Sequence, residues 1–183
     1  MSTESTVTHI LSKLLYELPV VVDEVDCNYC SSRTSQKGFC LPICLTANLQ
    51  ELSTYLNQTL EDQRSQCKKC QESKTVKRIL SKTFLIIELV DFINTDRASG
   101  ILREYETKPC ELPATVVVQE VEYILRGFLG FCGRTTSFTS VGHYVAYARR
   151  SNDTWELYDD TKDSKSFVSP SKQVPCQVLV YSI

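Results

Sequence analysis

The sequence predicts an α+β fold, in which a helix-bearing, cysteine-paired N-terminal portion leads into a mainly β C-terminal portion. Three observations support this fold class. Apolar residues recur at helical spacing near the N-terminus, and two Cys-x-x-Cys pairs follow within the first 70 residues. From Thr75 onward, runs rich in Val, Ile, Tyr and Phe are bounded by clusters of Gly, Pro, Asn, Asp and Ser, which is typical of an antiparallel sheet.

The N-terminal portion contains two predicted helices. The first lies in "STVTHILSKLLYEL" and ends at about Leu18, and the second lies in "NLQELSTYLNQTL". Between them, "PVVVDEVDC" predicts a strand that enters the first cysteine pair, and "GFCLPICL" predicts an apolar strand. A polar loop is predicted between the second helix and the second cysteine pair.

The C-terminal portion contains the predicted strands of the sheet. In chain order they are "VKRIL", "TFLIIELVDF", "ATVVVQEVEYILRGFLGFCG", "GHYVAYARR", "TWELYDD" and "QVLVYSI".

Length and composition indicate an ordinary globular chain of 183 residues, with 42% hydrophobic and 23% charged residues. The formal net charge of -2 argues against a surface that binds nucleic acid. No apolar run approaches the roughly 20 residues that cross a bilayer, and the N-terminus has no secretory apolar core. We therefore expect no membrane partner and an intracellular location, cytoplasmic and/or nuclear.

Nine cysteines without an export signal favour metal binding or catalysis over a disulfide framework. Cys27 and Cys30 form one pair, Cys67 and Cys70 form the other, and 36 residues separate the pairs. Two such pairs can place four thiolates around one structural Zn²⁺. The separation exceeds the usual spacing of about 15–20 residues, so the intervening segment must loop out. The alternative is that the pairs are incidental in a cysteine-rich chain.

One of the two histidines, His143, stands at the start of a predicted strand in "SVGHYVAYARRSNDTWELYDD". Antiparallel pairing across the "RRSNDT" turn would bring Asp159 or Asp160 near this histidine. A carboxylate there would hold the imidazole in one tautomer and leave its other nitrogen facing a nucleophile. The alternative is a buried or surface histidine without chemistry.

The segment "YILRGFLGFCGRTTSFTSVGHYVAYARRSNDTWELYDD" resembles the histidine box of the ubiquitin-specific proteases, the papain-like cysteine deubiquitinases. "KRILSKTFLIIELVDF" is similar to the palm strand of that family, and the two cysteine pairs lie where the family has its zinc-bearing fingers. The resemblance extends from about Leu15 to Ile183.

The resemblance implies a role for each site residue. His143 would be the general base, Asp159 its orienting acid and Asp160 a polar support for the oxyanion. The four paired cysteines would be the zinc ligands. The partner would be ubiquitin or a ubiquitin-like protein, gripped by palm and fingers.

The resemblance also implies a fold, namely the palm and fingers of a right-hand architecture. The fingers, with a zinc ribbon, would extend from about residue 19 to about residue 82 and would include "GFCLPICL" as an apolar strand. The palm, with its histidine box, would extend from about residue 83 to residue 183. The family's thumb, which carries the nucleophilic cysteine box, has no counterpart in the sequence, so we expect a partial domain.

We therefore expect a relative of the thiol-dependent deubiquitinases, and we expect the isolated chain to be inactive because it lacks the nucleophilic cysteine box. One alternative is a non-catalytic module that binds ubiquitin or another partner. Another is the palm half of a split or partial deubiquitinase whose thumb comes from a second chain or a longer gene product. A zinc-ribbon scaffold, supported only by the cysteine pairs, is the third.

Overall fold

The computed structural model describes residues 6–44, 48–60, 63–90, 105–132 and 143–183. These ranges are rich in strands and contain few helices, in agreement with the predicted α+β class. The helices are α1 (Thr6–Leu14) and α2 (Leu52–Thr59), with short 3₁₀ turns η1 (Leu49–Glu51) and η2 (Pro109–Glu111). Within the described ranges, no helix has the length and apolar character needed to cross a membrane.

The strands carry the rest of the regular structure. In chain order they are β1 (Val21–Cys27), β2 (Ser32–Gly38), β3 (Leu41–Cys44), β4 (Gln63–Gln66), β5 (Ser73–Leu80), β6 (Phe84–Val90), β7 (Glu106–Thr107), β8 (Thr115–Val118), β9 (Val121–Cys132), β10 (His143–Arg149), β11 (Trp155–Tyr158), β12 (Ser166–Val168), β13 (Val174–Pro175) and β14 (Val178–Ser182).

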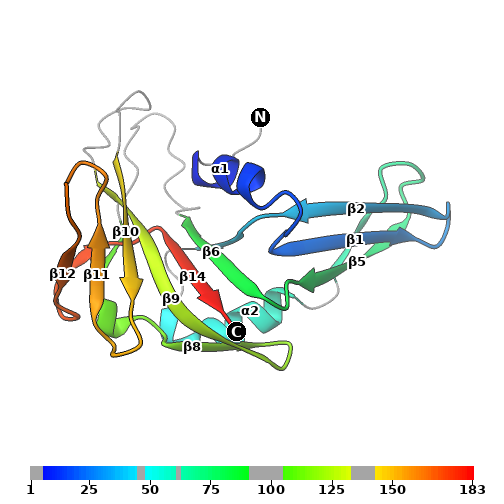
Figure 1. Cartoon of the computed structure of the whole chain (residues 1–183). Helices are drawn as coiled ribbons and strands as arrows, with labels where there is room; N and C mark the ends of the chain where they lie inside the picture. Colours follow the sequence, from blue (N-terminus) through cyan, green and yellow to red (C-terminus); the bar gives the residue numbers. More distant parts are fainter. Residues whose placement is uncertain (1–5, 45–47, 61–62, 91–104, 133–142) are drawn as a thin grey trace, which may run out of the picture.

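A small antiparallel sheet with the order β2-β1-β5-β4 extends away from the rest of the molecule (Figure 1). The predicted polar loop before the second cysteine pair is wrong in part, because Gln63–Gln66 forms strand β4 beside β5. Its residues, "QRSQ", have no apolar alternation, so the sequence carries no strand signal there. Pairing of the backbone with β5 is sufficient to make it a strand.

A large sheet with the order β12-β11-β10-β9-β14-β6-β3 forms the body of the molecule, and β8 also pairs with β9. The pairs are antiparallel except β3 with β6, which is parallel. The expectation that "GFCLPICL" is a finger strand is therefore wrong. Leu41 and Ile43 of β3 are buried, and the large sheet offers them an apolar core that the small sheet lacks.

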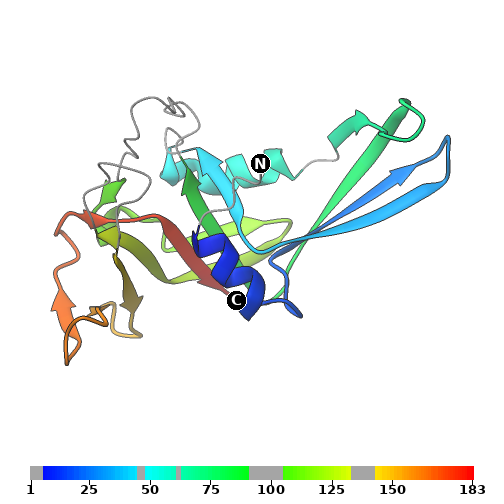
Figure 2. The ribbon, with the colours of Figure 1, turned by 90° about the horizontal axis from the view of Figure 1, so that it is seen from above.

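The core of the large sheet combines buried aliphatic side chains with an aromatic cluster around Phe128. Five successive residues of β6, from Leu85 to Leu89, are buried, as expected of a strand covered on both faces. Figures 1 and 2 show α1 and α2 on opposite sides of this sheet. Toward β11, Phe128 stacks on Tyr147 with ring centroids 4.4 Å apart, and Trp155 lies 5.3 Å from Phe128.

Helix α2 covers the outer edge of β8 through polar side chains. Asn57 accepts a hydrogen bond from the Gln119 amide at 2.9 Å and donates one to the Val117 carbonyl at 2.9 Å. Ser53 accepts one from the Val117 amide at 3.0 Å. The helix thus satisfies backbone groups that an open sheet edge would leave exposed to other strands.

Candidate functional site

Strands β10 and β11 bring His143 and Asp159 together. Their antiparallel register pairs Ala146 with Tyr158, so the residue after β11 lies near the start of β10, at the same end of the two strands (Figure 1). His143 Nε2 and Asp159 Oδ1 are 2.8 Å apart. The hydrogen bond predicted from the hairpin pattern is therefore present.

The carboxylate of Asp159 is held by two neighbours in addition to His143. Thr161 donates to Asp159 Oδ1 from its hydroxyl at 2.6 Å and from its backbone amide at 3.1 Å, and Lys162 Nζ lies 3.1 Å from Oδ2. The Thr161 hydroxyl first, then His143 and Lys162, hold the pKa of Asp159 well below its usual range. The residue is thus ionised at neutral pH and favours the tautomer of His143 with hydrogen on Nε2.

Sequence reasoning missed both Thr161 and Lys162. A usable signal was present, because Asp followed two residues later by Thr is the spacing at which an aspartate side chain accepts from the backbone of a turn.

Asp160 lies on the opposite side of the imidazole. Its Oδ1 is 3.3 Å from His143 Nδ1, and its side chain is 86% exposed. The two aspartates therefore bracket the ring, one fixed by several hydrogen bonds and the other at the solvent surface.

A pocket of about 480 Å³ adjoins the pair. The half-buried side chains of Leu129, Tyr144 and Ala146 line it on the sheet side, and Asp159, Asp160 and residues 162–165 line it on the loop side. Asp160 belongs both to this pocket and to the contact with His143. A group that enters the pocket would therefore touch the residue that faces Nδ1.

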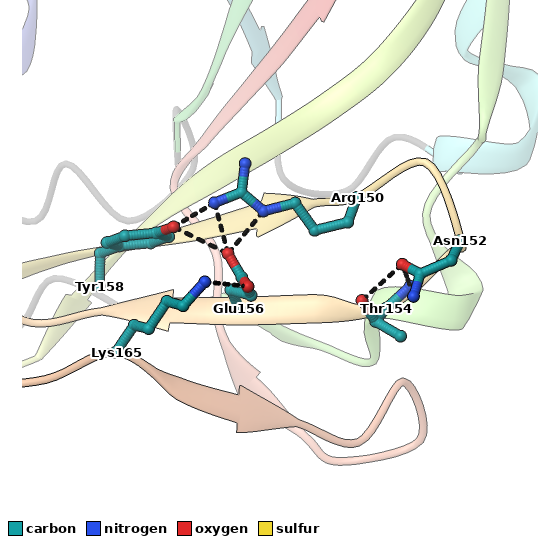
Figure 3. A network of polar contacts seen from close by, with 6 residues as sticks. All are labelled: Arg150, Asn152, Thr154, Glu156, Tyr158 and Lys165. Atoms are coloured by element: carbon teal, nitrogen blue, oxygen red, sulfur yellow. Dashed lines mark hydrogen bonds and ion pairs between the residues drawn. The ribbon is translucent and has the colours of Figure 1, made fainter.

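A polar network anchors the far end of the loop that follows Asp159 (Figure 3). Glu156 is buried, and it accepts hydrogen bonds from Lys165 Nζ at 2.5 Å, from the Tyr158 hydroxyl at 2.7 Å and from Arg150 Nε at 2.5 Å. Lys165 first, then Tyr158 and Arg150, lower the pKa of Glu156 to about 2. The ion pair with Lys165 ties the loop to β11, so both ends of the loop are held.

The second candidate site is the group of four cysteines predicted from the two pairs. The turn after β1 carries Cys30, the turn between β4 and β5 carries Cys67 and Cys70, and both turns lie at the far tip of the small sheet (Figure 1). Cys27 Sγ is 3.5 Å from Cys70 Sγ, and Cys30 Sγ is 3.7 Å from Cys67 Sγ.

The geometry of this cysteine cluster fits zinc. All four sulfur atoms lie within 4.8 Å of one another. Tetrahedral Zn²⁺ with bonds of 2.3 Å places its sulfur ligands about 3.8 Å apart, close to the two distances above. The residue after each pair, Ser31 with φ 52° and Gln71 with φ 63°, adopts the left-handed conformation that reverses the chain there. The four cysteines could therefore hold one zinc ion as a closed structural site.

The protonation of the cysteine cluster is uneven. Backbone amides of Cys70 and Lys69 lower the pKa of Cys67 to about 6. The Glu72 amide acts to lower the pKa of Cys70, but burial and the three neighbouring cysteines raise it to about 12. Four thiolates this close repel one another, so their joint ionisation requires a cation.

The other cysteines with described side chains lie elsewhere. Cys176 is buried, which raises its pKa, and Cys110 is exposed. Cys40 is half-buried against the core. Cys132 is exposed at the end of β9 and is paired with His143 in the register of β9 and β10.

No family model matches the sequence. A stretch of 73 residues is 29% identical to the 120.7 kDa protein in the NOF-FB transposable element of Drosophila melanogaster, and this stretch is 39% of the present chain and 7% of that protein.

Solved structures of a deubiquitinase (DUB) module are similar in fold. The match to the SAGA Ubp8/Sgf11/Sus1/Sgf73 DUB module covers 90% of the present chain and 38% of the solved chain, with 17% identity and a TM-score of 0.56. The match to the yeast SAGA DUB module with an Sgf73 mutant covers 89% of the present chain and 40% of the solved chain, with 16% identity and a TM-score of 0.55. The match to a SAGA DUB module bound to monoubiquitin covers the same two shares, 89% and 40%, with 16% identity and a TM-score of 0.50.

The present chain thus spans about two fifths of the length of the solved chains that it matches. The expected likeness to a deubiquitinase is confirmed at the level of the fold: the chain is similar to a part of the SAGA Ubp8 deubiquitinase module.

Proposed function

We propose that this chain is the palm and fingers portion of a protein related to the ubiquitin-specific proteases, and that it holds ubiquitin or a ubiquitin-like protein. The proposed fingers, about 19–82, contain the small sheet, and the proposed palm, about 83–183, contains the other strands of the large sheet. From the first range, β3 pairs within the large sheet and α2 lies against its strand β8. The observation that carries the proposal is the 2.8 Å hydrogen bond between His143 and Asp159, at the ends of two paired strands in a fold similar to a deubiquitinase module over 90% of the chain.

The roles of the pair follow from which nitrogen each group contacts. Asp159, ionised and fixed, accepts a hydrogen bond from Nε2–H, so Nδ1 carries the lone pair of the neutral ring. His143 would take a thiol proton on Nδ1 as general base and return it to the leaving amine as general acid. Asp159 would stabilise the imidazolium formed between these steps.

Asp160 supports the same cycle from the other side. Its contact with Nδ1 at 3.3 Å favours a role in stabilising the imidazolium. Its high exposure lets the side chain withdraw when a thiol approaches. The role as a support for the oxyanion, which the family resemblance implies, stays a prediction.

We propose that the nucleophile of the triad is not among the cysteines of this sequence. Four cysteines form the cluster at the tip, and Cys176 is buried with a raised pKa, which disfavours the reactive thiolate. Cys132, across from His143, is the cysteine that the experiment must exclude. In this proposal the thiol comes from a thumb-bearing segment or chain outside this sequence, and the isolated chain does not hydrolyse ubiquitin conjugates.

Zinc at Cys27, Cys30, Cys67 and Cys70 would be structural. Bound there, it would supply charge neutralisation and a cross-link between two hairpins, with no open coordination position for chemistry. In this proposal the chain works inside the cell, in the cytoplasm and/or the nucleus, where thiols stay reduced.

If no thumb is supplied, the palm and fingers would form a non-catalytic module that binds ubiquitin or a related partner. The solved module bound to monoubiquitin has a similar fold, which supports ubiquitin as the first ligand to test. An intact His143–Asp159 pair favours descent from an active enzyme, because a pure binder needs neither residue.

The test combines a plain ubiquitin titration with a ubiquitin probe that carries a thiol-reactive group at its C-terminus. We expect weak, saturable binding of ubiquitin and no covalent adduct. Failure to bind ubiquitin would remove the proposed function.

The Cys132→Ser variant is the critical control, because register places Cys132 across from His143. An adduct that forms with the native chain and disappears in this variant would identify Cys132 as the nucleophile and overturn the expected inactivity. Cys110→Ser, at an exposed cysteine outside the cluster, is the matched control for loss of a surface thiol.

A further inference from the structure

A serine hydroxyl lies between two sulfur atoms of the cysteine cluster. Ser32 is the first residue of β2, and its Oγ is 3.2 Å from Cys30 Sγ and 3.9 Å from Cys67 Sγ. Cys30 and Cys67 belong to different cysteine pairs, and their own sulfur atoms are 3.7 Å apart. The hydroxyl therefore contacts the cluster where its two halves meet.

The direction of this hydrogen bond depends on the state of the sulfur. A protonated Cys30 thiol donates to Ser32 Oγ. A zinc-bound thiolate has no hydrogen, so it can only accept, and the Ser32 hydroxyl must then donate. Four thiolates around Zn²⁺ carry a net charge of about −2, and a donor to one of them spreads that charge.

We propose that Ser32 is the outer-sphere hydrogen-bond donor of the cysteine cluster and sets how tightly the cluster holds zinc. This inference rests on the proposed zinc site. It assigns to Ser32 a positioning role, in which the hydroxyl holds Cys30 Sγ in place through a hydrogen bond.

The second cysteine pair lacks an equivalent group at the matching place. Glu72 follows Cys70 by two residues, as Ser32 follows Cys30, and each comes after a residue in the left-handed conformation. Glu72 contributes its backbone carbonyl, which accepts from the Cys67 amide at 2.8 Å. A carboxylate side chain has no proton to donate at neutral pH, so the backbone pattern repeats while the side-chain donor does not.

The test compares two nearly isosteric replacements, Ser32→Thr and Ser32→Val, of which only the first keeps the hydroxyl. Both side chains are β-branched and suit a strand. Ser35→Val, at an exposed position of the same strand, is the control for a change of strand propensity alone. Zinc affinity is measured on the full chain by competition with a chelator, and Co²⁺ substitution reports the sulfur-to-metal charge-transfer band.

We expect Ser32→Val to weaken zinc binding by about 10–100-fold, the usual effect of losing an outer-shell partner, and to shift the Co²⁺ band. Ser32→Thr and Ser35→Val should stay close to the native affinity. Equal affinities and spectra for Ser32→Thr and Ser32→Val would overturn the role of Ser32. A native chain that binds no zinc would instead overturn the zinc site itself, so the two failures are distinguishable. Loss of binding in Ser32→Thr as well would show that the site depends on side-chain size, and would also reject the proposal.

Discussion

The small and large sheets share mainly antiparallel pairing but are held together by different forces. In the small sheet, the side chains of β2 are exposed or half-buried, and those of β5 alternate between exposed and half-buried up to Leu80. In the large sheet, strands such as β6 are buried along most of their length. A sheet without an apolar face cannot rely on burial, so we expect the small one to depend on the proposed zinc site at its tip and on cross-strand ion pairs.

Loss of the zinc site should give the largest effect. We expect Cys27→Ser and Cys67→Ser each to abolish zinc binding and to remove hydrogen-exchange protection from β1, β2, β4 and β5, while the large sheet keeps its protection. The reason is that a structural metal site contributes folding free energy directly. Metal analysis and hydrogen exchange with mass spectrometry measure the two effects.

Cys110→Ser, at an exposed cysteine outside the cluster, should change neither the zinc content nor the hydrogen-exchange protection of the small sheet. If both cluster variants kept their metal and their thermal stability, the assignment of the small sheet as a zinc-bearing finger would be wrong.

The next largest effect should come from the aromatic core of the large sheet. Phe128 is 1% exposed and contacts Tyr147 and Trp155. We expect Phe128→Ala to lower the free energy of unfolding by about 3–5 kcal/mol through loss of burial and the cavity left behind. Denaturant unfolding followed by tryptophan fluorescence measures it.

Zinc stoichiometry in the folded Phe128→Ala variant should stay native, since the cluster lies in the other sheet. Phe167→Ala is the matched control, because Phe167 is 74% exposed. A comparable decrease in the free energy of unfolding in both variants would mean that the burial of Phe128 does not account for its effect on stability.

An intermediate effect should appear as a dependence of stability on pH. The pKa of Glu156 is lowered from 4.5 to about 2 by Lys165, Tyr158 and Arg150. A lowered folded-state pKa contributes stability above the unfolded pKa, and that contribution is lost as the pH falls from about 4.5 toward about 2. We expect Glu156→Gln to flatten the stability curve over this window.

Glu122→Gln, at an exposed glutamate of β9, is the control for Glu156→Gln and should leave the pH profile unchanged. Parallel profiles for the native chain and Glu156→Gln would show that the network of Figure 3 is not ionic in solution.

The smallest effect should come from an ion pair within the small sheet. Arg78 donates two hydrogen bonds to Asp23, at 2.6 and 2.8 Å, across the paired strands β5 and β1. Both side chains are about three quarters buried, and the geometry is bidentate. We expect a coupling free energy of about 0.5–1 kcal/mol in a double-mutant cycle, decreasing with salt.

Arg33 and Asp26, which are 3.1 Å apart but more exposed, form the comparison pair and should couple more weakly. Equal coupling for the two pairs would argue against a special role for Arg78 and Asp23 in a sheet that lacks an apolar face.

Short-range patterns were enough to predict several features. The spacing of two Cys-x-x-Cys pairs predicted the cysteine cluster, and a strand-turn-strand pattern placed His143 against Asp159. Both predictions depend on turns, whose residue preferences are local, so the chain near each turn contains the information. The helix in "NLQELSTYLNQTL" was found for the same reason, because its apolar periodicity is complete within one segment.

The sequence alone was therefore enough to predict the class of fold, the hairpin that brings His143 to Asp159 and the four cysteines that lie together. The folded structure was needed to show that β3 joins the large sheet, that "QRSQ" is a strand, and that Thr161, Lys165 and Ser32 contact Asp159, Glu156 and Cys30. Strand pairing between distant segments depends on burial and on backbone hydrogen bonds that any residue can make. It therefore cannot be predicted from the sequence of one strand. A supporting hydroxyl or ammonium group likewise acquires its role only when folding brings it within hydrogen-bond distance of its partner.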